Sequence, residues 1–159
     1  MQAREETYGT KARSWAKHTL AAVLLVIATT PTALSRSDGS LTVIVTNLRN
    51  DAGMLHVAIW QGPDGFADGD YSLAKVREPA NGREQRIVFD GLAPGRYALA
   101  AFHDENGNGK FDRTWLGLPA EGLGFSNGAW IEAFGPPSFE TAAIEITATE
   151  ASTVIELRY

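Results

Sequence analysis

The chain of 159 residues has the length of one domain, and its 44% hydrophobic and 21% charged residues exclude a disordered or fibrous protein. It has no cysteine, which excludes a disulfide framework, a thiolate nucleophile and thiolate metal ligands. The formal net charge of −5 argues against a protein that binds nucleic acid through a basic surface.

The first 35 residues have the pattern of a secretory signal peptide. Four basic residues lie within residues 1–17, an unbroken apolar run follows at 20–28, and the segment ends in Ala33-Leu34-Ser35. The run is too short for a membrane span, which needs roughly 20 apolar residues. We expect cleavage after Ser35 and a mature domain of residues 36–159 that is periplasmic or secreted and has no stable membrane span. An uncleaved N-terminal anchor is the alternative.

The mature chain has the pattern of short strands separated by turns. Leu55, Val57 and Ile59 alternate with other residues and therefore share one face of a strand. We expect a hairpin turn at 50–53, a loop at 61–70, and a helical turn or short strand at 71–76. The expected strands are 41–46, 54–60, 86–89, 96–103, 142–147 and 153–159.

This order of elements predicts an all-β fold, a single antiparallel β-sandwich of about seven strands that is prealbumin- or immunoglobulin-like. Residues 113–139 interrupt the pattern with several prolines and glycines. We interpret them as one long loop, and a loop of that length in a compact domain is usually functional.

Several motifs of the mature chain occur together. They are FDGLAPGRYAL at 89–99, AFHDENGNGKFD at 101–112, GLGFSN at 122–127 and FGPPSF at 134–139. With these motifs the chain resembles the DUF2141 family of bacterial exported proteins over roughly residues 40–159. The first motif also resembles the turn and strand of prealbumin-like and Cna-B-like sandwiches. The resemblance implies a β-sandwich and export, but no activity and no substrate, because the family has no established biochemical function.

The segment 104–112 follows the first nine positions of a calcium-binding loop. Calcium prefers six to eight oxygen ligands, and alternate residues of a tight loop direct their oxygens to one centre. Gly109 lies at position 6, where the sharp turn is required. The predicted ligands are the side chains of Asp104, Asn106, Asn108 and Asp112 and the backbone carbonyl of Lys110.

The loop is not an EF-hand, because position 12 is Trp115 and the flanking segment is a strand. A carboxylate outside the loop could complete the ligand shell, and the sequence does not rank Glu105, Glu121 and Asp90 for this role. The other interpretation is a plain turn, since Asn-Gly is also a common turn dipeptide.

Five large aromatic residues fall within residues 115–139, and so many cannot all be exposed without a reason. They form either a small second core beneath the long loop or an aromatic platform for a sugar or an apolar small molecule. The candidate ligand-binding residues are Trp115, Phe125, Asn127, Trp130 and Phe134.

Signals for catalysis are weaker. Ser126 lies in a G-x-S-x-G string, but the strand, sharp turn and helix that expose such a nucleophile are not predicted here. Two histidines, His56 and His103, could bind a transition metal, and two glutamates, Glu132 and Glu140, could form the acid pair of a glycosidase. Both pairs are more simply explained as ordinary polar residues. The sequence therefore predicts a non-enzymatic exported binding or structural module, stabilised by calcium, with an unknown ligand or envelope partner. The alternative is a small carbohydrate- or ester-active hydrolase that uses polar groups of residues 113–139.

Overall fold

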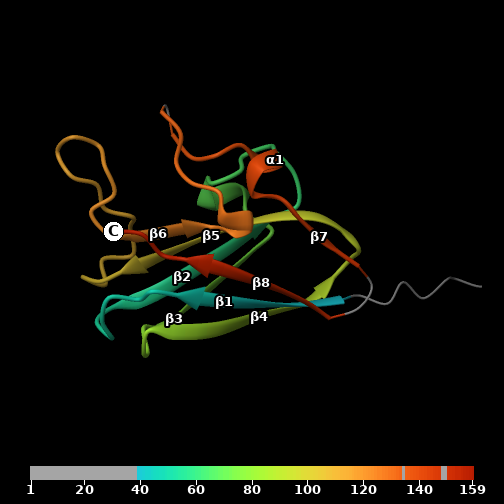
Figure 1. The fold of residues 1–159 in the computed structure, drawn as a ribbon, viewed down its shortest axis with the longest axis horizontal. Helices are drawn as coiled ribbons and strands as arrows, with labels where there is room; N and C mark the ends of the chain where they lie inside the picture. The colour runs from blue at the N-terminus through green and yellow to red at the C-terminus, as the bar shows by residue number, and fades with distance from the viewer. Residues whose placement is uncertain (1–38, 134, 148–149) are drawn as a thin grey trace, which may run out of the picture. The chain divides into compact units, whose positions relative to one another are not determined.

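The computed structural model describes residues 39–133, 135–147 and 150–159, so the expected signal segment 1–35 and Phe134 lie outside the described residues. The described residues form eight strands, two 3-10 turns and one short helix (Figure 1). The strands are β1 (Gly39–Thr46), β2 (Met54–Trp60), β3 (Ala74–Pro79), β4 (Glu84–Leu92), β5 (Gly95–Asp104), β6 (Gly122–Phe125), β7 (Ile144–Ile146) and β8 (Ala151–Glu156); the helical elements are η1 (Gly69–Tyr71), η2 (Ser126–Gly128) and α1 (Phe139–Ala142).

The strands form two sheets packed face to face, which confirms the predicted all-β sandwich. One sheet has the order β4-β1-β8, and the other has the order β3-β2-β5-β6 with β7 paired to β5. One strand pairing departs from the predicted antiparallel sandwich, because β8 pairs with β1 in parallel, from Leu41 opposite Ala151 to Thr46 opposite Glu156. Two parallel neighbouring strands need a long connection between them. Here that connection consists of strands β2 to β7, most of which belong to the other sheet.

The main core lies between the two sheets and is built by strict alternation. Every second residue of β1 is buried, and Leu55, Val57 and Ile59 of β2 are at most 1% exposed, as predicted. Ile87 and Phe89 of β4 point into the same core. Because both sheets contribute to one apolar cluster, the sandwich is held together mainly by hydrophobic burial.

The segment 113–139 is not one long loop, because it contains the strand β6. All four residues of β6 are buried, and the backbone groups of Leu123 pair with those of Arg158, N to O at 2.9 Å in both directions. Gly124 permits this contact, since a Cβ atom there would lie 2.6 Å from the carbonyl oxygen of Glu156. The glycines that resemble loop residues in the sequence are therefore needed for close packing of the chain.

Two smaller expectations also change, and one ambiguous segment is resolved. Residues 50–53 do not form a hairpin turn, because they join β1 of one sheet to β2 of the other. The ambiguous segment 71–76 contains the end of η1 and the start of β3. The strand expected at 142–147 is shortened to β7, because its first residue ends α1, which Ser138 caps by accepting a hydrogen bond from Thr141 N at 3.2 Å.

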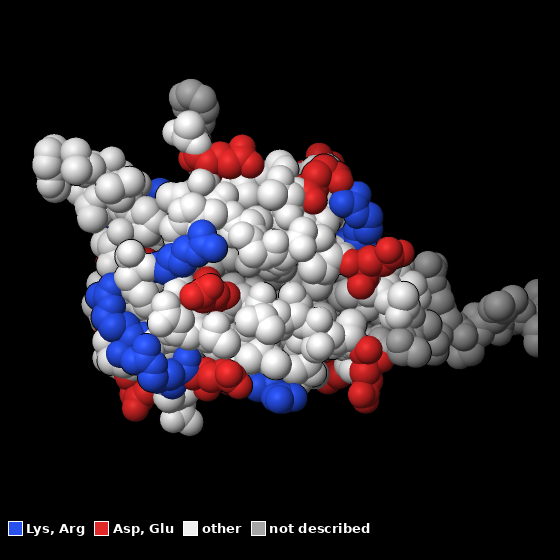
Figure 2. Space-filling view, viewed as in Figure 1, with Lys and Arg blue, Asp and Glu red and all other residues white. Residues whose placement is uncertain are grey.

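A second apolar cluster covers the outer face of the larger sheet. Ala98, Phe125, Phe139 and Ala142 are buried there, and Phe66 contributes from the loop after β2. The four β2 residues that do not face the main core are Met54, His56, Ala58 and Trp60, so the outer face of this strand carries mostly apolar and aromatic side chains. On the side of the molecule seen in Figure 2, acidic and basic side chains lie among one another.

Candidate calcium loop and adjoining pocket

Asp104 ends strand β5, and its side chain is completely buried. Its two carboxylate oxygens accept hydrogen bonds from the backbone N–H groups of Asn108, at 3.0 Å, and Gly109, at 2.8 Å. The imidazole of His56 lies 3.3 Å from Oδ2 and the guanidinium of Arg77 lies 3.8 Å from it. Burial alone would raise the pKa of Asp104, but these backbone donors and His56 bring it below its ordinary value.

The side-chain amides of the two loop asparagines converge on Asp112. The side-chain amides of Asn106 and Asn108 donate hydrogen bonds to Asp112 Oδ2 at 2.7 and 2.8 Å, and Asn108 Oδ1 accepts one from Lys110 N at 2.8 Å. Gly109 has a φ of 79°, a conformation that favours glycine at the sharp turn. The structure thus brings the four predicted side-chain ligands together in one compact loop.

Glu121 is the outside carboxylate that best fits this loop. It is only 4% exposed, and its Oε2 accepts a hydrogen bond from Asp112 N at 3.0 Å. Among the described residues its Oε1 has no hydrogen bond of good geometry, although the backbone N–H of Glu105 lies near the carboxylate and opposes the rise of its pKa. Burial and the nearby charges of Asp104 and Asp112 raise the pKa of Glu121. A buried carboxylate oxygen without a donor is costly, and a cation would compensate it.

The other two outside candidates are placed differently. Glu105 is engaged by Asn50, whose Nδ2 donates to Oε1 at 3.1 Å, and by Arg49, at 3.5 Å from Oε2. Asp90 is exposed on β4 just before the turn into β5, whereas the loop begins at the opposite end of that ten-residue strand. Of the three carboxylates outside the loop, Glu121 is therefore the best placed to act as a further ligand.

Within the described residues, no three His, Asp or Glu side chains are gathered closely enough to hold a metal ion by themselves. The predicted set differs from such a cluster because it combines two aspartates with two asparagine amides and a backbone carbonyl. The two asparagines present their Nδ2 groups to Asp112 while their Oδ1 atoms accept backbone hydrogen bonds, so a bound calcium ion would require these amides to rotate.

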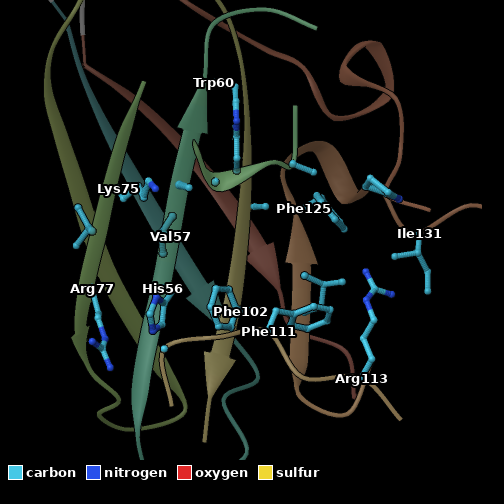
Figure 3. A pocket seen from close by; sticks show the side chains of 18 residues that line it. His56, Val57, Trp60, Lys75, Arg77, Phe102, Phe111, Arg113, Phe125 and Ile131 are labelled. Atoms are coloured by element: carbon cyan, nitrogen blue, oxygen red, sulfur yellow. The ribbon is translucent and has the colours of Figure 1, made fainter. Parts of the chain in front are cut away.

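A pocket of about 540 Å³ adjoins the loop on the outer face of the larger sheet (Figure 3). Gly109 and Phe111 of the loop line one side of it, so the loop that contains the predicted ligands also shapes the pocket. The ring of His56 stacks on that of Phe102 with centroids 4.3 Å apart, and Phe111 packs edge-on against Phe102. Burial lowers the pKa of His56, although its hydrogen bond to Asp104 opposes the shift.

The aromatic residues predicted to bind a ligand are placed in different environments. Phe125 lines the pocket, whereas Trp130 packs at the edge of the second cluster with the guanidinium of Arg158 4.8 Å from its ring centre. Asn127 donates its side-chain amide to Thr141 O at 2.9 Å. Trp115 is 92% exposed in the turn between Thr114 and Gly117 and is not part of the second cluster.

Sequence reasoning missed most of the pocket. His56, Lys75 and Arg77 come from β2 and β3, and Phe102 comes from β5. The available signal was the outer face of β2, where His56, Ala58 and Trp60 alternate with the core residues. A strand face that is open to solvent would carry more polar residues, so this pattern indicates that other segments of the chain cover the outer face of β2.

Ser126 has a structural role rather than the exposed position of a nucleophile. Its side chain is completely buried, and its Oγ accepts a hydrogen bond from Leu99 N at 2.9 Å and donates one to Ala142 O at 2.6 Å. It therefore ties β5 to the end of α1. Glu140 forms an exposed ion pair with Arg96, at 2.6 Å, and His103 is buried with its ring nitrogens near Tyr159 Oη and Ala52 O.

We predict that Ser126→Ala lowers the free energy of unfolding by about 1–3 kcal/mol, because two buried backbone groups lose their partner. Urea unfolding measures this loss, and Ser152→Ala on the exposed side of β8 is the control, with a change within about 0.5 kcal/mol. Unchanged stability together with the loss of a hydrolytic activity would instead restore the hydrolase interpretation.

The fold and the site define a small β-sandwich domain with an acidic loop beside a cationic, aromatic pocket. The profile of the DUF2141 family, described as an uncharacterized protein conserved in bacteria, matches residues 43–154, and the chain belongs to this family. The membership expected from the motifs is thereby confirmed. No curated protein and no solved structure matches the chain. Among the described residues, none of the helices has the length and apolar character needed to cross a bilayer.

Proposed function

We propose that this protein is an exported, non-enzymatic binding module of the bacterial envelope whose β-sandwich is stabilised by calcium in the loop 104–112. The ligands are Asp104, Asn106, Asn108, Asp112 and the carbonyl of Lys110, and Glu121 completes the shell. The proposed location, periplasmic or secreted, rests on the signal-peptide pattern of residues 1–35.

The buried carboxylate of Glu121 is the observation that carries the proposal: among the described residues its Oε1 has no hydrogen bond of good geometry, although the backbone N–H of Glu105 lies near enough to oppose the rise of its pKa. Burial, together with the nearby charges of Asp104 and Asp112, makes ionisation of Glu121 unfavourable. A divalent cation would remove both penalties at once, because it neutralises the repulsion and supplies the missing partner. Oxygen ligands of this kind favour calcium over softer metals.

Calcium is expected to raise the thermal stability of the purified protein. An ion that binds only the folded state stabilises it by about 1.4 kcal/mol at ten times the dissociation constant, which shifts the melting temperature by a few degrees. Extracellular modules bind calcium with dissociation constants on the order of 10⁻⁴–10⁻³ M, so melts in chelator and in 10 mM calcium are the measurement. Magnesium should have a much smaller effect, because it keeps its water ligands.

Two substitutions separate a specific site from general screening by the salt. Asp112→Asn should abolish the calcium-dependent shift, since it removes a charged ligand from the loop. Asp64→Asn makes the same chemical change at an exposed residue outside the loop and should leave the shift intact. Identical melting temperatures of the unaltered protein in chelator and in calcium, or equal effects of the two substitutions, would overturn the proposal.

A further inference from the structure

The pocket on the outer face of the larger sheet has a floor of small residues between taller aromatic ends. Ala58 of β2 and Ala100 of β5 are direct neighbours across the two strands and both line the pocket. Trp60 stands at one end of the same face, and His56 with Phe102 at the other. Two adjacent alanines below these larger side chains leave a space that a flat or slender apolar group can enter.

The charged side chains that line the pocket all carry positive charge. They are Lys75 and Arg77 on β3 and Arg113 on the other side of the aromatic rings (Figure 3), and none of the described lining residues is acidic. This is unexpected by composition, since acidic residues outnumber basic ones 19 to 14 in the chain. The pocket is thus a local concentration of positive charge on an acidic protein, which attracts anions.

Lys75 is the cation best placed to act on a ligand. Arg77 lies 3.8 Å from the buried carboxylate of Asp104, and Arg113 donates a hydrogen bond to Gly117 O at 3.0 Å. Lys75 is exposed at the edge of the pocket opposite Gly69, and within the described part of the chain it has no ion pair. The carboxylate of Asp68, the residue before Gly69 in the sequence, accepts a hydrogen bond from Asp70 N at 3.0 Å.

From this combination we infer that the pocket binds a small carboxylate with an apolar body. The apolar part lies on Ala58 and Ala100 between the aromatic side chains, and the carboxylate accepts a hydrogen bond from the ammonium group of Lys75. A volume of about 540 Å³ is within the range of pockets that enclose small organic ligands. The inference goes beyond the proposed calcium site and depends on none of its ligands.

Matched probes test the charge and the apolar requirement separately. The carboxylates 2-naphthoate and decanoate are compared with the alcohols 2-naphthalenemethanol and decanol and with the cation decyltrimethylammonium, by calorimetry or by tryptophan fluorescence. We expect at least one carboxylate to bind about tenfold more tightly than its alcohol, as one charge-assisted hydrogen bond provides. Preference for the alcohol or the cation, or no binding by any probe, would overturn the inference.

Three variants locate the binding. Lys75→Met should weaken the carboxylate about tenfold while leaving the affinity of the alcohol unchanged. Ala100→Leu fills the floor and should abolish binding of both probes. Arg86→Gln removes a positive charge from the exposed side of the other sheet and should have no effect. Unchanged binding in both Lys75→Met and Ala100→Leu would place the probe elsewhere and refute the assignment.

The titrations are made in chelator with variants whose melting temperatures match that of the unaltered protein. Loss of binding is then not a consequence of unfolding. A protein that binds 2-naphthoate in chelator but shows no calcium-dependent melting shift retains this inference and refutes the calcium site. The reverse result retains the calcium site alone.

Discussion

Gly124→Val is expected to destabilise the fold by at least about 3 kcal/mol, a large part of the 5–15 kcal/mol that stabilises a typical domain. Even the first added atom, Cβ, would lie 2.6 Å from Glu156 O and 2.7 Å from Ile155 Cγ2. The carbonyl oxygen belongs to the backbone of β8, so it cannot move aside without disturbing the pairing of β8 with β1. Urea unfolding followed by circular dichroism measures the loss.

Gly62→Val is the matched control for this substitution. A Cβ atom at Gly62 meets nothing within 4 Å, and its backbone does not require glycine. Its effect on the free energy of unfolding is expected to stay within about 0.5 kcal/mol. Equal losses in the two variants would mean that β6 does not pack against β8 as described.

Asp104→Ala is expected to cost about 3 kcal/mol even in chelator. The substitution leaves the N–H groups of Asn108 and Gly109 without their acceptor and removes the carboxylate beside Arg77. Hydrogen bonds to a charged group contribute about 1.5–3 kcal/mol each, and part of this is recovered as water enters the opened loop. The calcium-dependent shift should disappear as well. Chemical unfolding in chelator and in calcium measures both effects.

Glu121→Gln is expected to change stability in the opposite direction. Because burial and nearby negative charges raise the pKa of Glu121 in the folded state, its ionisation costs stability once the pH exceeds the ordinary value of 4.5. Near pH 7 the neutral glutamine avoids this cost, so the variant should be more stable than the unaltered protein in chelator. It should also lose the calcium-dependent shift. A less stable variant that still responds to calcium would exclude Glu121 as a ligand.

Local patterns in the sequence determined the class of fold and the contents of the loop. Alternation identified the inward faces of β2 and β4, because side chains on a strand point to opposite sides at every residue. The spacing of Asp104, Asn106, Asn108 and Asp112 brought these side chains together, since all four lie within nine residues and the turn at Gly109 is local. Features that depend on neighbours in sequence were therefore accessible without the structure.

Tertiary structure decided which segments meet. Strand β6 resembles a loop in the sequence, because a glycine that permits close backbone packing cannot be told from one that permits a turn. Three features join residues from separate segments of the chain. Strand β8 pairs in parallel with β1, and Glu121 lies near Asp104 and Asp112. The pocket is lined by Lys75, Ala100 and Phe111 together. Such contacts follow from how the two sheets pack and cross over, and alternation within a single strand carries no information about its partners.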